Sequence, residues 1–181
     1  MTMTPHSVEP ASRDGGAVEA GEARVGVKPI IDLSAMDLAA RIHGKAEIER
    51  FIPHRGQMSL VDWIVWTTPD FRAGVGLKHV RTDEFWVPGH FPGKALMPGV
   101  LMIEAAAQFG CYLYNRRLSA VQLMAFVRIE EASFRLPVVP GDDLFLLATE
   151  VKYGRRRFVS NIQGVVDGRV TFDARIAGMQ L

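Results

Sequence analysis

Several features that direct a protein to a membrane, an oxidising compartment or a metal are scarce in this sequence. Its 181 residues include one cysteine, Cys111, so no intrachain disulfide can form and a reducing compartment such as the cytoplasm is expected. No apolar run approaches the roughly 18 residues of a membrane span. The N-terminus has no basic start followed by an apolar core, so no secretory signal is expected.

Motifs for metals and nucleotides are also missing, and charge of either sign is not in excess. The five histidines and the cysteine show no metal-ligand spacing, and we find neither a dinucleotide-binding pattern nor a nucleophile elbow. A formal net charge of +1 does not point to nucleic acid. What the sequence does have is 48% hydrophobic residues, ample for a core.

The chain is predicted to hold one domain behind a tail. Residues 1–26 contain no leucine, isoleucine or aromatic residue, so they bury too little apolar surface to offset the entropy of ordering. We therefore expect a disordered tail over residues 1–29 and one domain over residues 30–181. Two short helices are expected first: one after Ser34, where Asp37 resembles the second half of a capping box, and one over residues 45–52.

Runs rich in β-branched and aromatic residues predict an antiparallel sheet of about six strands. Hairpin-length connections favour antiparallel pairing, and Asp167-Gly168 is a typical hairpin turn. The runs cover residues 61–68, 71–80, 121–129, 132–136, 143–153, 155–166 and 169–179.

The long helix predicted between the second and third runs is apolar on nearly every side. It begins at Pro98 and reaches about Tyr114, and Glu104 and Gln108 are its polar exceptions. A helix that is apolar all round is normally buried. In a chain with one sheet, curling the sheet around the helix buries it best, so we predict an α+β hot-dog arrangement.

Glu104 is a candidate catalytic acid. A carboxyl group is almost never buried without a partner or a task, and burial favours its neutral form. Gln108 lies one turn later on the same face, where it can hydrogen-bond to Glu104. The alternative is structural: an acid paired with a basic residue or with backbone donors.

His90 and Gly99 are candidates for a base and an oxyanion donor. Glycines and prolines around His90 restrict its loop, and an imidazole suits a general base near neutral pH. The alternative is a histidine that braces the loop. Gly99 lies at the helix start, where its N–H and the helix dipole would stabilise charge on a thioester carbonyl. A plain helix start explains Gly99 equally well.

Two further sets of residues are candidates for substrate and partner contacts. An acyl tunnel would be lined by Phe91, Met97, Met102 and Phe109, although core packing explains each of them as well. A set of cations could dock an acidic carrier protein. The alternative is that they are an ordinary solvated face. They are Arg116, Arg117, Lys152, Arg155, Arg156 and Arg157.

The stretch GHFPGKALMPGVLMIEAAAQ, residues 89–108, resembles the signature of the FabZ-type 3-hydroxyacyl-acyl carrier protein dehydratases. Similar motifs are IPHRGQMSLVD at residues 52–62, FRLPVVPGDDL at 134–144 and VVDGRV at 165–170. The resemblance extends from about Lys45 to the C-terminus.

The resemblance implies a hot-dog fold and a working dimer, often assembled further into a trimer of dimers. It implies loss of water from a (3R)-hydroxyacyl thioester in fatty-acid biosynthesis, with His90 as base and Glu104 as acid. Gly99 matches the glycine whose N–H polarises the carbonyl, and Gln108 the glutamine that holds the acid. The resemblance also implies that the histidine and acid of one site come from different subunits. The substrate arrives on the phosphopantetheine of acyl carrier protein, so no metal or redox cofactor is expected.

Two departures from the family pattern leave the pathway open. Many members read roughly HRYPFLLVDR where this chain has HRGQMSLVDW at residues 54–63, and the N-terminal extension is longer than usual. These changes leave the chemistry intact, but they leave the acyl chain length, the gating and the pathway open. The same reaction in a specialised lipid or polyene pathway is therefore an alternative, and a hot-dog acyl thioesterase is another.

Overall fold

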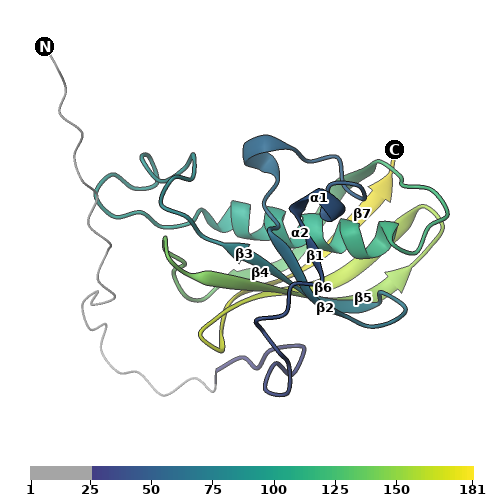
Figure 1. Cartoon of the computed structure of the whole chain (residues 1–181), viewed down its shortest axis with the longest axis horizontal. Coiled ribbons are helices and arrows are strands. Elements are labelled where there is room, and N and C mark those ends of the chain that lie inside the picture. Colours follow the sequence, from purple (N-terminus) through teal and green to yellow (C-terminus); the bar gives the residue numbers. More distant parts are fainter. Residues whose placement is uncertain (1–25) are drawn as a thin grey trace, which may run out of the picture.

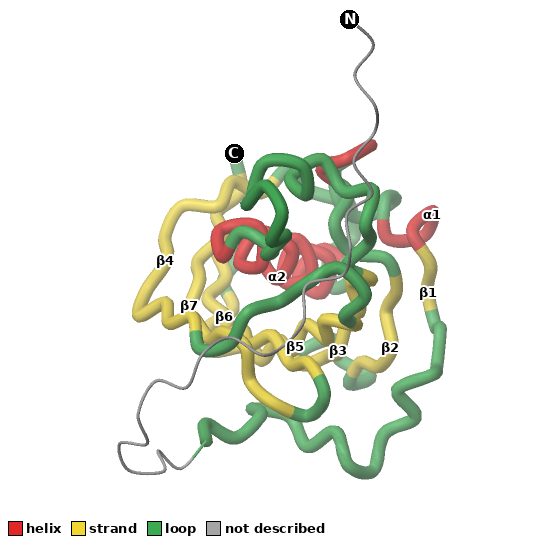
Figure 2. Tube along the Cα trace, turned by 90° about the vertical axis from the view of Figure 1, so that its left-hand side faces the viewer, coloured by secondary structure: helices red, strands yellow, loops and turns green. Residues whose placement is uncertain are grey.

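One antiparallel sheet curves around one long helix in the computed structural model of this chain, which describes residues 26–181 (Figure 1). The view along the helix shows α2 (Gly99–Asn115) lying inside the curve of the sheet (Figure 2). The predicted α+β hot-dog fold is confirmed. Most of the predicted tail, residues 1–25, lies outside the described residues.

The sheet has seven strands in the order β1-β2-β3-β5-β6-β7-β4, and every neighbouring pair is antiparallel. The strands are β1 (His43–Gly44), β2 (Trp63–Thr67), β3 (Ala73–His79), β4 (Met124–Phe134), β5 (Asp143–Tyr153), β6 (Arg157–Val166) and β7 (Arg169–Gln180). Besides α2, the helices are α1 (Lys45–Ile48) and the 3-10 helix η1 (Gly56–Met58).

Most predicted strands lie within a few residues of the observed ones, and one division was wrong. Residues 121–129 and 132–136 are not two strands but one, β4, whose register against β7 shifts between Glu130 and Ser133. Glu131, at this irregularity, has a positive φ of 49°. The local twist of a bulge lets a strand continue past such a residue. The turn at Asp167-Gly168 has φ values of 49° and 72°, as expected for this hairpin.

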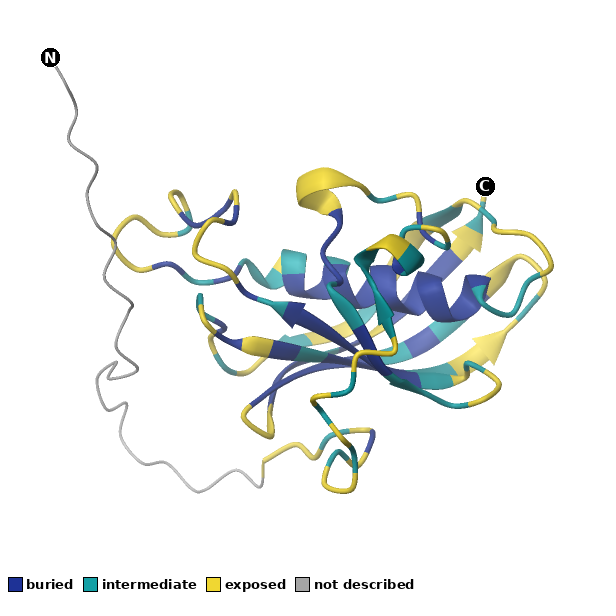
Figure 3. Cartoon of the chain, viewed as in Figure 1, coloured by how far each residue is buried: buried dark blue, intermediate teal, exposed yellow. Residues whose placement is uncertain are grey.

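Burial of α2 explains its composition. Every residue from Ala105 to Asn115 is buried, and Figure 3 shows exposed positions only in its first turns. The helix packs closely on β3, because a Cβ added at Gly74 or Gly76 would lie 2.9 or 3.2 Å from the ring of Phe109. Glycines in β3 therefore make room for a large aromatic side chain of the helix. Within the described part of the chain, no helix is long and apolar enough to cross a membrane.

The first predicted N-terminal helix, after Ser34, was wrong. Asp32 Oδ1 accepts a hydrogen bond from the N–H of Ser34 at 2.9 Å, and Asp37 Oδ1 accepts one from Ala39 at 3.0 Å. Such side-chain bonds compete with helical ones and favour turns. The second predicted helix is present as α1, which is shorter than expected.

The segment before β1 instead covers the outer face of the sheet. Ile31 is buried there with Val75 of β3 and Val165 of β6. The N–H of Ile30 donates to Gln163 Oε1 at 2.7 Å, which ties the segment to β6. The sheet is therefore covered on both faces, by α2 inside its curve and by this segment outside.

Candidate active site

Gln108 holds the carboxylate of Glu104 in a fixed position. Its Nε2 donates to Glu104 Oε1 at 2.9 Å and to the carbonyl of Met58 at 2.8 Å. Its Oε1 accepts from the N–H of Leu60 at 3.0 Å. With both amide hydrogens in use and the side chain 1% exposed, the amide has one orientation, which presents an N–H to Glu104. Gln108 thus meets the structural condition for the supporting role expected of it.

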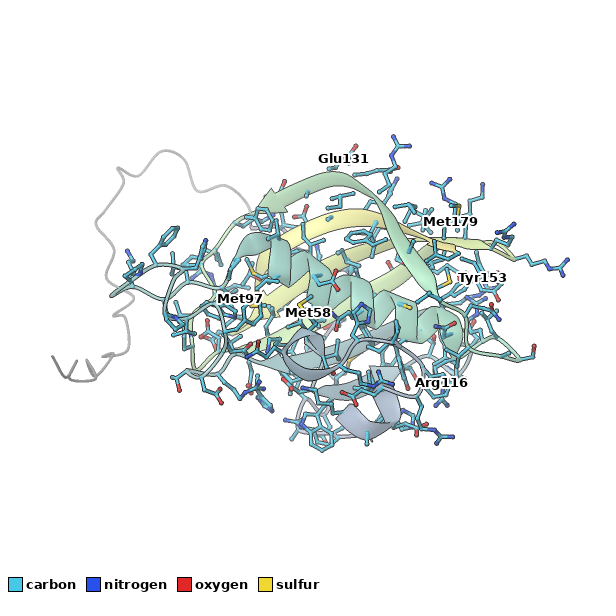
Figure 4. The ribbon with its side chains drawn as sticks, turned by 90° about the horizontal axis from the view of Figure 1, so that it is seen from above. Met58, Met97, Arg116, Glu131, Tyr153 and Met179 are labelled. Atoms are coloured by element: carbon cyan, nitrogen blue, oxygen red, sulfur yellow. The ribbon has the colours of Figure 1, made fainter. Side chains whose placement is uncertain are left out.

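The segment that departs from the family pattern supplies the two backbone groups that hold Gln108. It forms η1, which begins at Gly56, whose φ of 59° lies in the left-handed region that favours glycine. The chain then passes α2 so that residues 58 and 60 reach Gln108 (Figure 4). The unusual side chains of this segment therefore leave the support of Glu104 intact.

A second histidine, His54, contacts Glu104 and was given no role in the sequence analysis. Its Nε2 lies 3.4 Å from Glu104 Oε1. Burial lowers the pKa of His54, the charge of Glu104 opposes this shift, and Arg55 adds to it. Its Nδ1 is buried without a hydrogen-bond partner among the described residues. The one sequence feature that could have pointed to His54 is its place in the IPHR motif. The sequence does not show that His54 faces Glu104.

His90 is oriented by its own loop. Its Nδ1 lies 2.8 Å from the carbonyl oxygen of Leu96. Because a carbonyl only accepts, Nδ1 carries the hydrogen, and Nε2 of the neutral ring is left as the basic nitrogen. The ring stacks on Phe91 with centroids 4.1 Å apart, and the N–H of His90 donates to the carbonyl of Trp86 at 2.8 Å. This geometry suits a general base.

A buried ion pair anchors the segment that leads to His90. Lys78 Nζ of β3 lies 2.5 Å from Glu84 Oε1, and their side chains are 1% and 3% exposed. Lys78 also donates to the carbonyl of His79 at 3.2 Å. A buried charge needs a partner of this kind. The pair ties the start of the loop to the sheet, six residues before His90.

Gly99 opens α2 and leaves its N–H available. The N–H groups of Leu101 and Met102 bond to the carbonyl of Pro98, whereas those of Gly99 and Val100 have no acceptor among residues 26–181. A Cβ at Gly99 would lie 2.6 Å from the ring of Phe134 in β4. The position therefore requires glycine for packing, and its N–H remains free to bind a ligand oxygen.

A small cavity of about 80 Å³ lies beside Glu104, between α2 and the strands β4, β6 and β7. Its lining combines polar and apolar groups and consists of His54, Glu104, Ala107, Gln108, Cys111, Met124, Ala125, Phe126, Phe158, Ile176 and Gly178. Neither His90 nor Gly99 lines it. The cavity beside the predicted acid therefore does not include the predicted base among the described residues that line it.

The four residues considered for an acyl tunnel do not line this cavity. Met97, Met102 and Phe109 are buried in the core, and Phe109 faces β3. Phe91 is 52% exposed beside His90. The apolar side chains of Met97, Met102 and Phe109 predicted their burial, whereas tertiary packing decided where each of them points.

The six candidate docking cations fall into two groups. Arg116 and Arg117 are 22% and 16% exposed and pair with Glu47 and Glu150. The Arg116 guanidinium also lies 4.7 Å from the Phe51 ring centroid. By contrast, the β5–β6 hairpin exposes four cations that form no ion pair with a described residue: Lys152, Arg155, Arg156 and Arg157. Figure 4 shows Tyr153 of this hairpin at the same end of the molecule as Arg116.

The Cys111 thiol is unreactive, and the described residues do not form a group of metal ligands. Burial raises the pKa of Cys111 to about 12, with Glu104 adding to the shift, so this thiol is an inert part of the cavity wall. Among residues 26–181, no three His, Cys, Asp or Glu side chains are grouped to hold a metal ion.

Residues 52–175 match the family described as "FabA-like domain". The 3-hydroxyacyl-[acyl-carrier-protein] dehydratase FabZ of Acidiphilium cryptum is 37% identical over 151 residues, which cover 82% of this chain and 91% of that protein. FabZ of Sinorhizobium fredii is 36% identical over 148 residues, covering 80% of this chain and 96% of that protein.

Solved structures with the same fold are far less similar in sequence. The dehydratase heterocomplex ApeI:P from Xenorhabdus doucetiae matches with a TM-score of 0.65 at 17% identity, covering 74% of this chain and 90% of that one. The E. coli PaaI protein from the phenylacetic acid degradation operon matches with a TM-score of 0.54 at 14% identity, covering 75% and 89%. These two likenesses show the fold alone.

Proposed function

This chain belongs to the FabA-like family and, within it, to the FabZ-type dehydratases, and we propose that it removes water from (3R)-hydroxyacyl-acyl carrier protein in fatty-acid biosynthesis. The product is the trans-2-enoyl thioester. The observation that carries the proposal is the carboxylate of Glu104, fixed by a fully bonded Gln108 at a cavity between α2 and the sheet. We place this activity in the cytoplasm and in a single domain of residues 30–181 that follows a tail of residues 1–29.

In the proposed reaction, His90 removes a proton from C2 of the acyl chain. Its Nδ1–H bond to Leu96 leaves Nε2 with the lone pair that accepts this proton. Charge then develops on the thioester carbonyl oxygen. The free N–H of Gly99, at the positive end of α2, suits a hydrogen bond to that oxygen.

Glu104 completes the elimination at C3. Its protonated carboxyl donates a proton to the C3 hydroxyl, the C3–O bond breaks, and water leaves as the C2=C3 double bond forms. The imidazolium of His90 and the carboxylate of Glu104 then return to their starting forms by proton exchange with solvent. The bond from Gln108 to Glu104 Oε1 favours Oε2 as the proton-bearing oxygen.

We further propose that the working unit is a homodimer, often assembled into a trimer of dimers. The cavity beside Glu104 lacks His90, so a second copy would have to supply the base. Among residues 26–181, β4 pairs with β7 alone, and it exposes Phe126, Val127 and Ile129. An edge strand with exposed apolar side chains suits pairing with another copy.

Acyl carrier protein is the proposed carrier of the substrate, held on its phosphopantetheine arm, so that no bound metal or redox cofactor takes part. The exposed cations of the β5–β6 hairpin suit an acidic carrier. Arg157 directly precedes Phe158, a wall residue of the cavity, so this hairpin lies next to the proposed site. Arg116 and Arg117 already have carboxylate partners and are weaker candidates.

The test is to incubate the protein with (3R)-hydroxyacyl- and trans-2-enoyl-acyl carrier protein and to follow water loss, hydration and free thiol. His90→Ala and Glu104→Gln should each lower kcat by about 10²- to 10⁴-fold while the thermal unfolding midpoint stays near that of the wild type. Matched controls are His79→Ala, which removes a partner of Asp143, and Glu131→Gln on exposed β4. Both controls should keep near-normal turnover.

Release of free thiol without interconversion of hydroxyacyl- and enoyl-acyl carrier protein would refute the dehydratase proposal and favour a thioesterase. Near-normal turnover by either site variant would remove that residue from the catalytic machinery.

A further inference from the structure

We propose that His54 and Gln108 together donate hydrogen bonds to one oxygen of Glu104, Oε1, so that the other oxygen, Oε2, carries the proton that is transferred to the departing hydroxyl. His54 is thus a positioning residue that acts through Glu104. The inference rests on the proposed function, which makes Glu104 the acid. It adds a role for a histidine outside the proposed proton transfers.

Two nitrogen atoms lie next to the same oxygen of Glu104. Gln108 Nε2 donates to Oε1 at 2.9 Å, and His54 Nε2 lies 3.4 Å from that oxygen. Contacts in active sites are often long before substrate binds and shorten in the complex. Two donors use both lone pairs of Oε1, so the proton of a neutral carboxyl is left to Oε2. Among residues 26–181, Oε2 has no hydrogen-bond partner, which leaves it available to the substrate.

The surroundings of His54 favour the tautomer that donates from Nε2. Its Nδ1 is buried without a hydrogen-bond partner among the described residues. A hydrogen on Nδ1 would be an unpaired buried donor, whereas a hydrogen on Nε2 has Glu104 Oε1 as its acceptor. His54 therefore carries its hydrogen on Nε2. This is the opposite of His90, whose Nδ1–H faces the carbonyl of Leu96.

His54 is also a neutral donor near pH 7. Burial lowers its pKa below 6.5, the charge of Glu104 opposes this shift, and Arg55 adds to it. Among the other side chains that line the cavity, burial raises the pKa of Cys111 to about 12, and those from β4, β6 and β7 have no ionisable group. An imidazolium would stabilise the carboxylate, whereas a neutral donor leaves the proton on Glu104.

The IPHR motif fixes the backbone that carries His54. Arg55 Nη1 donates to the carbonyls of Ile52 and His54, both at 2.7 Å, and its Nη2 donates to the carbonyl of Glu49 at 2.7 Å. Ile52 is 2% exposed in the core and anchors the start of the motif. The motif thus consists of a buried anchor, a histidine directed at Glu104 and an arginine that ties the turn together.

The experiment measures kcat and KM of the full chain with a (3R)-hydroxyacyl-acyl carrier protein from about pH 5 to about pH 10. His54→Leu removes the donor and should lower kcat about tenfold while KM stays within about twofold of the wild type. A hydrogen bond to a carboxylate favours its charged form. Loss of this bond should therefore also move the alkaline limb of the pH–rate profile to higher pH.

His54→Gln is the conservative variant, because its amide N–H replaces Nε2–H and cannot become charged. It should restore kcat to within about threefold of the wild type and return the alkaline limb to its place. The matched control is His79→Gln, which changes a histidine beside the carboxylate of Asp143, away from the cavity. It should keep the wild-type kcat and profile.

A second measurement reads the tautomer in the wild-type protein. NMR of ¹⁵N-labelled imidazoles at about pH 8 should show the hydrogen of His54 on Nε2 and that of His90 on Nδ1. The two signals are assigned by their loss in His54→Gln and in His90→Ala. If His54→Leu unfolds, as judged by thermal unfolding, His54→Ala takes its place.

An unchanged kcat and profile in the folded His54→Leu variant, an inactive His54→Gln, or a hydrogen on Nδ1 of His54 would each overturn the two-donor inference while leaving the dehydratase proposal in place. Absence of water loss by the wild type would overturn both. Restored activity in His54→Gln together with the Nε2–H tautomer would support the inference.

Discussion

Glu104 is controlled by two neighbours of different character. Gln108 is buried, fully hydrogen-bonded and fixed by the backbone of residues 58 and 60. His54 is titratable, only partly covered, and has one nitrogen near Glu104 and the other buried without a described partner. The first neighbour sets the direction of the carboxylate, whereas the second makes its surroundings depend on pH.

His54 should make the stability of the protein depend on pH. Burial holds its pKa below the ordinary value of 6.5, so the unfolded chain binds more protons near and below that pH. The contribution of His54 is therefore full above about pH 6.5 and is lost as the pH falls through its folded pKa. His54→Gln should show a smaller fall in unfolding midpoint between about pH 7 and pH 5 than the wild type.

The control for this measurement is Gln57→Ala, which changes an exposed residue of the same segment that does not titrate. Its pH dependence should stay closer to that of the wild type. If His54→Gln and the wild type lose the same amount over this pH range, then burial of His54 does not govern the acid sensitivity.

At the scale of elements, the proposed active site draws on one helix, one loop and one hairpin. The helix α2 carries both Gly99 and Glu104, the loop before it carries His90, and the β5–β6 hairpin lies beside the cavity. The hairpin is attached to α2 through the hydroxyl of Tyr114, which donates to the carbonyls of Gly154 and Arg155. A partner bound to the hairpin would therefore be held at a fixed distance from the helix.

Reversing one hairpin charge should weaken carrier binding without harming the chemistry. Arg156→Glu should raise KM for the acyl carrier protein substrate by roughly three- to tenfold, leave kcat nearly unchanged, and lose its effect at high salt. A small pantetheine thioester with the same acyl group should show no such change. Steady-state kinetics with both substrates measure the difference.

Arg50→Glu makes the same charge change at a position that pairs with Glu47 and is 73% exposed. It should leave both KM values near those of the wild type. An equal rise in KM for both substrates in Arg156→Glu would point to a damaged site rather than to carrier docking.

At the scale of the whole molecule, the separation of the predicted base and acid is the main feature. The cavity beside Glu104 is lined by five parts of the described chain, yet the loop of His90 is not among them. A dimer in which each copy gives its loop to the other would complete two equal sites. This arrangement would also cover the exposed apolar side chains of β4.

Mixing inactive variants tests this arrangement. His90→Ala and Glu104→Gln subunits, once exchanged at random, should recover up to about one quarter of the wild-type activity, because half of the dimers are mixed and each of these has one intact site of two. Subunit exchange is verified by native mass spectrometry of a tagged copy. Mixing Glu104→Gln with the double variant His90→Ala/Glu104→Gln provides the control, which should stay inactive.

Verified exchange without any recovery would count against a site shared between subunits. The same mixing experiment with acyl carrier protein in excess would show whether the substrate itself promotes dimer formation.

The sequence by itself determined the features that arise from neighbouring residues. The strands followed from β-branched and aromatic runs, and the buried α2 followed from its apolar pattern. Spacing by four residues placed Gln108 against Glu104. These inferences held because strand and helix geometry brings such residues together whatever the rest of the chain does.

Only the tertiary structure decided the contacts between distant segments. His54 reaches Glu104 from 50 residues away, Phe109 faces β3 rather than the cavity, and Arg116 and Arg117 are held by carboxylates from α1 and β5. The N-terminal segment lies on the sheet as turns instead of a helix. Residue type and spacing leave such outcomes open, because the curvature of the sheet and the rotation of α2 within it determine which side chains meet.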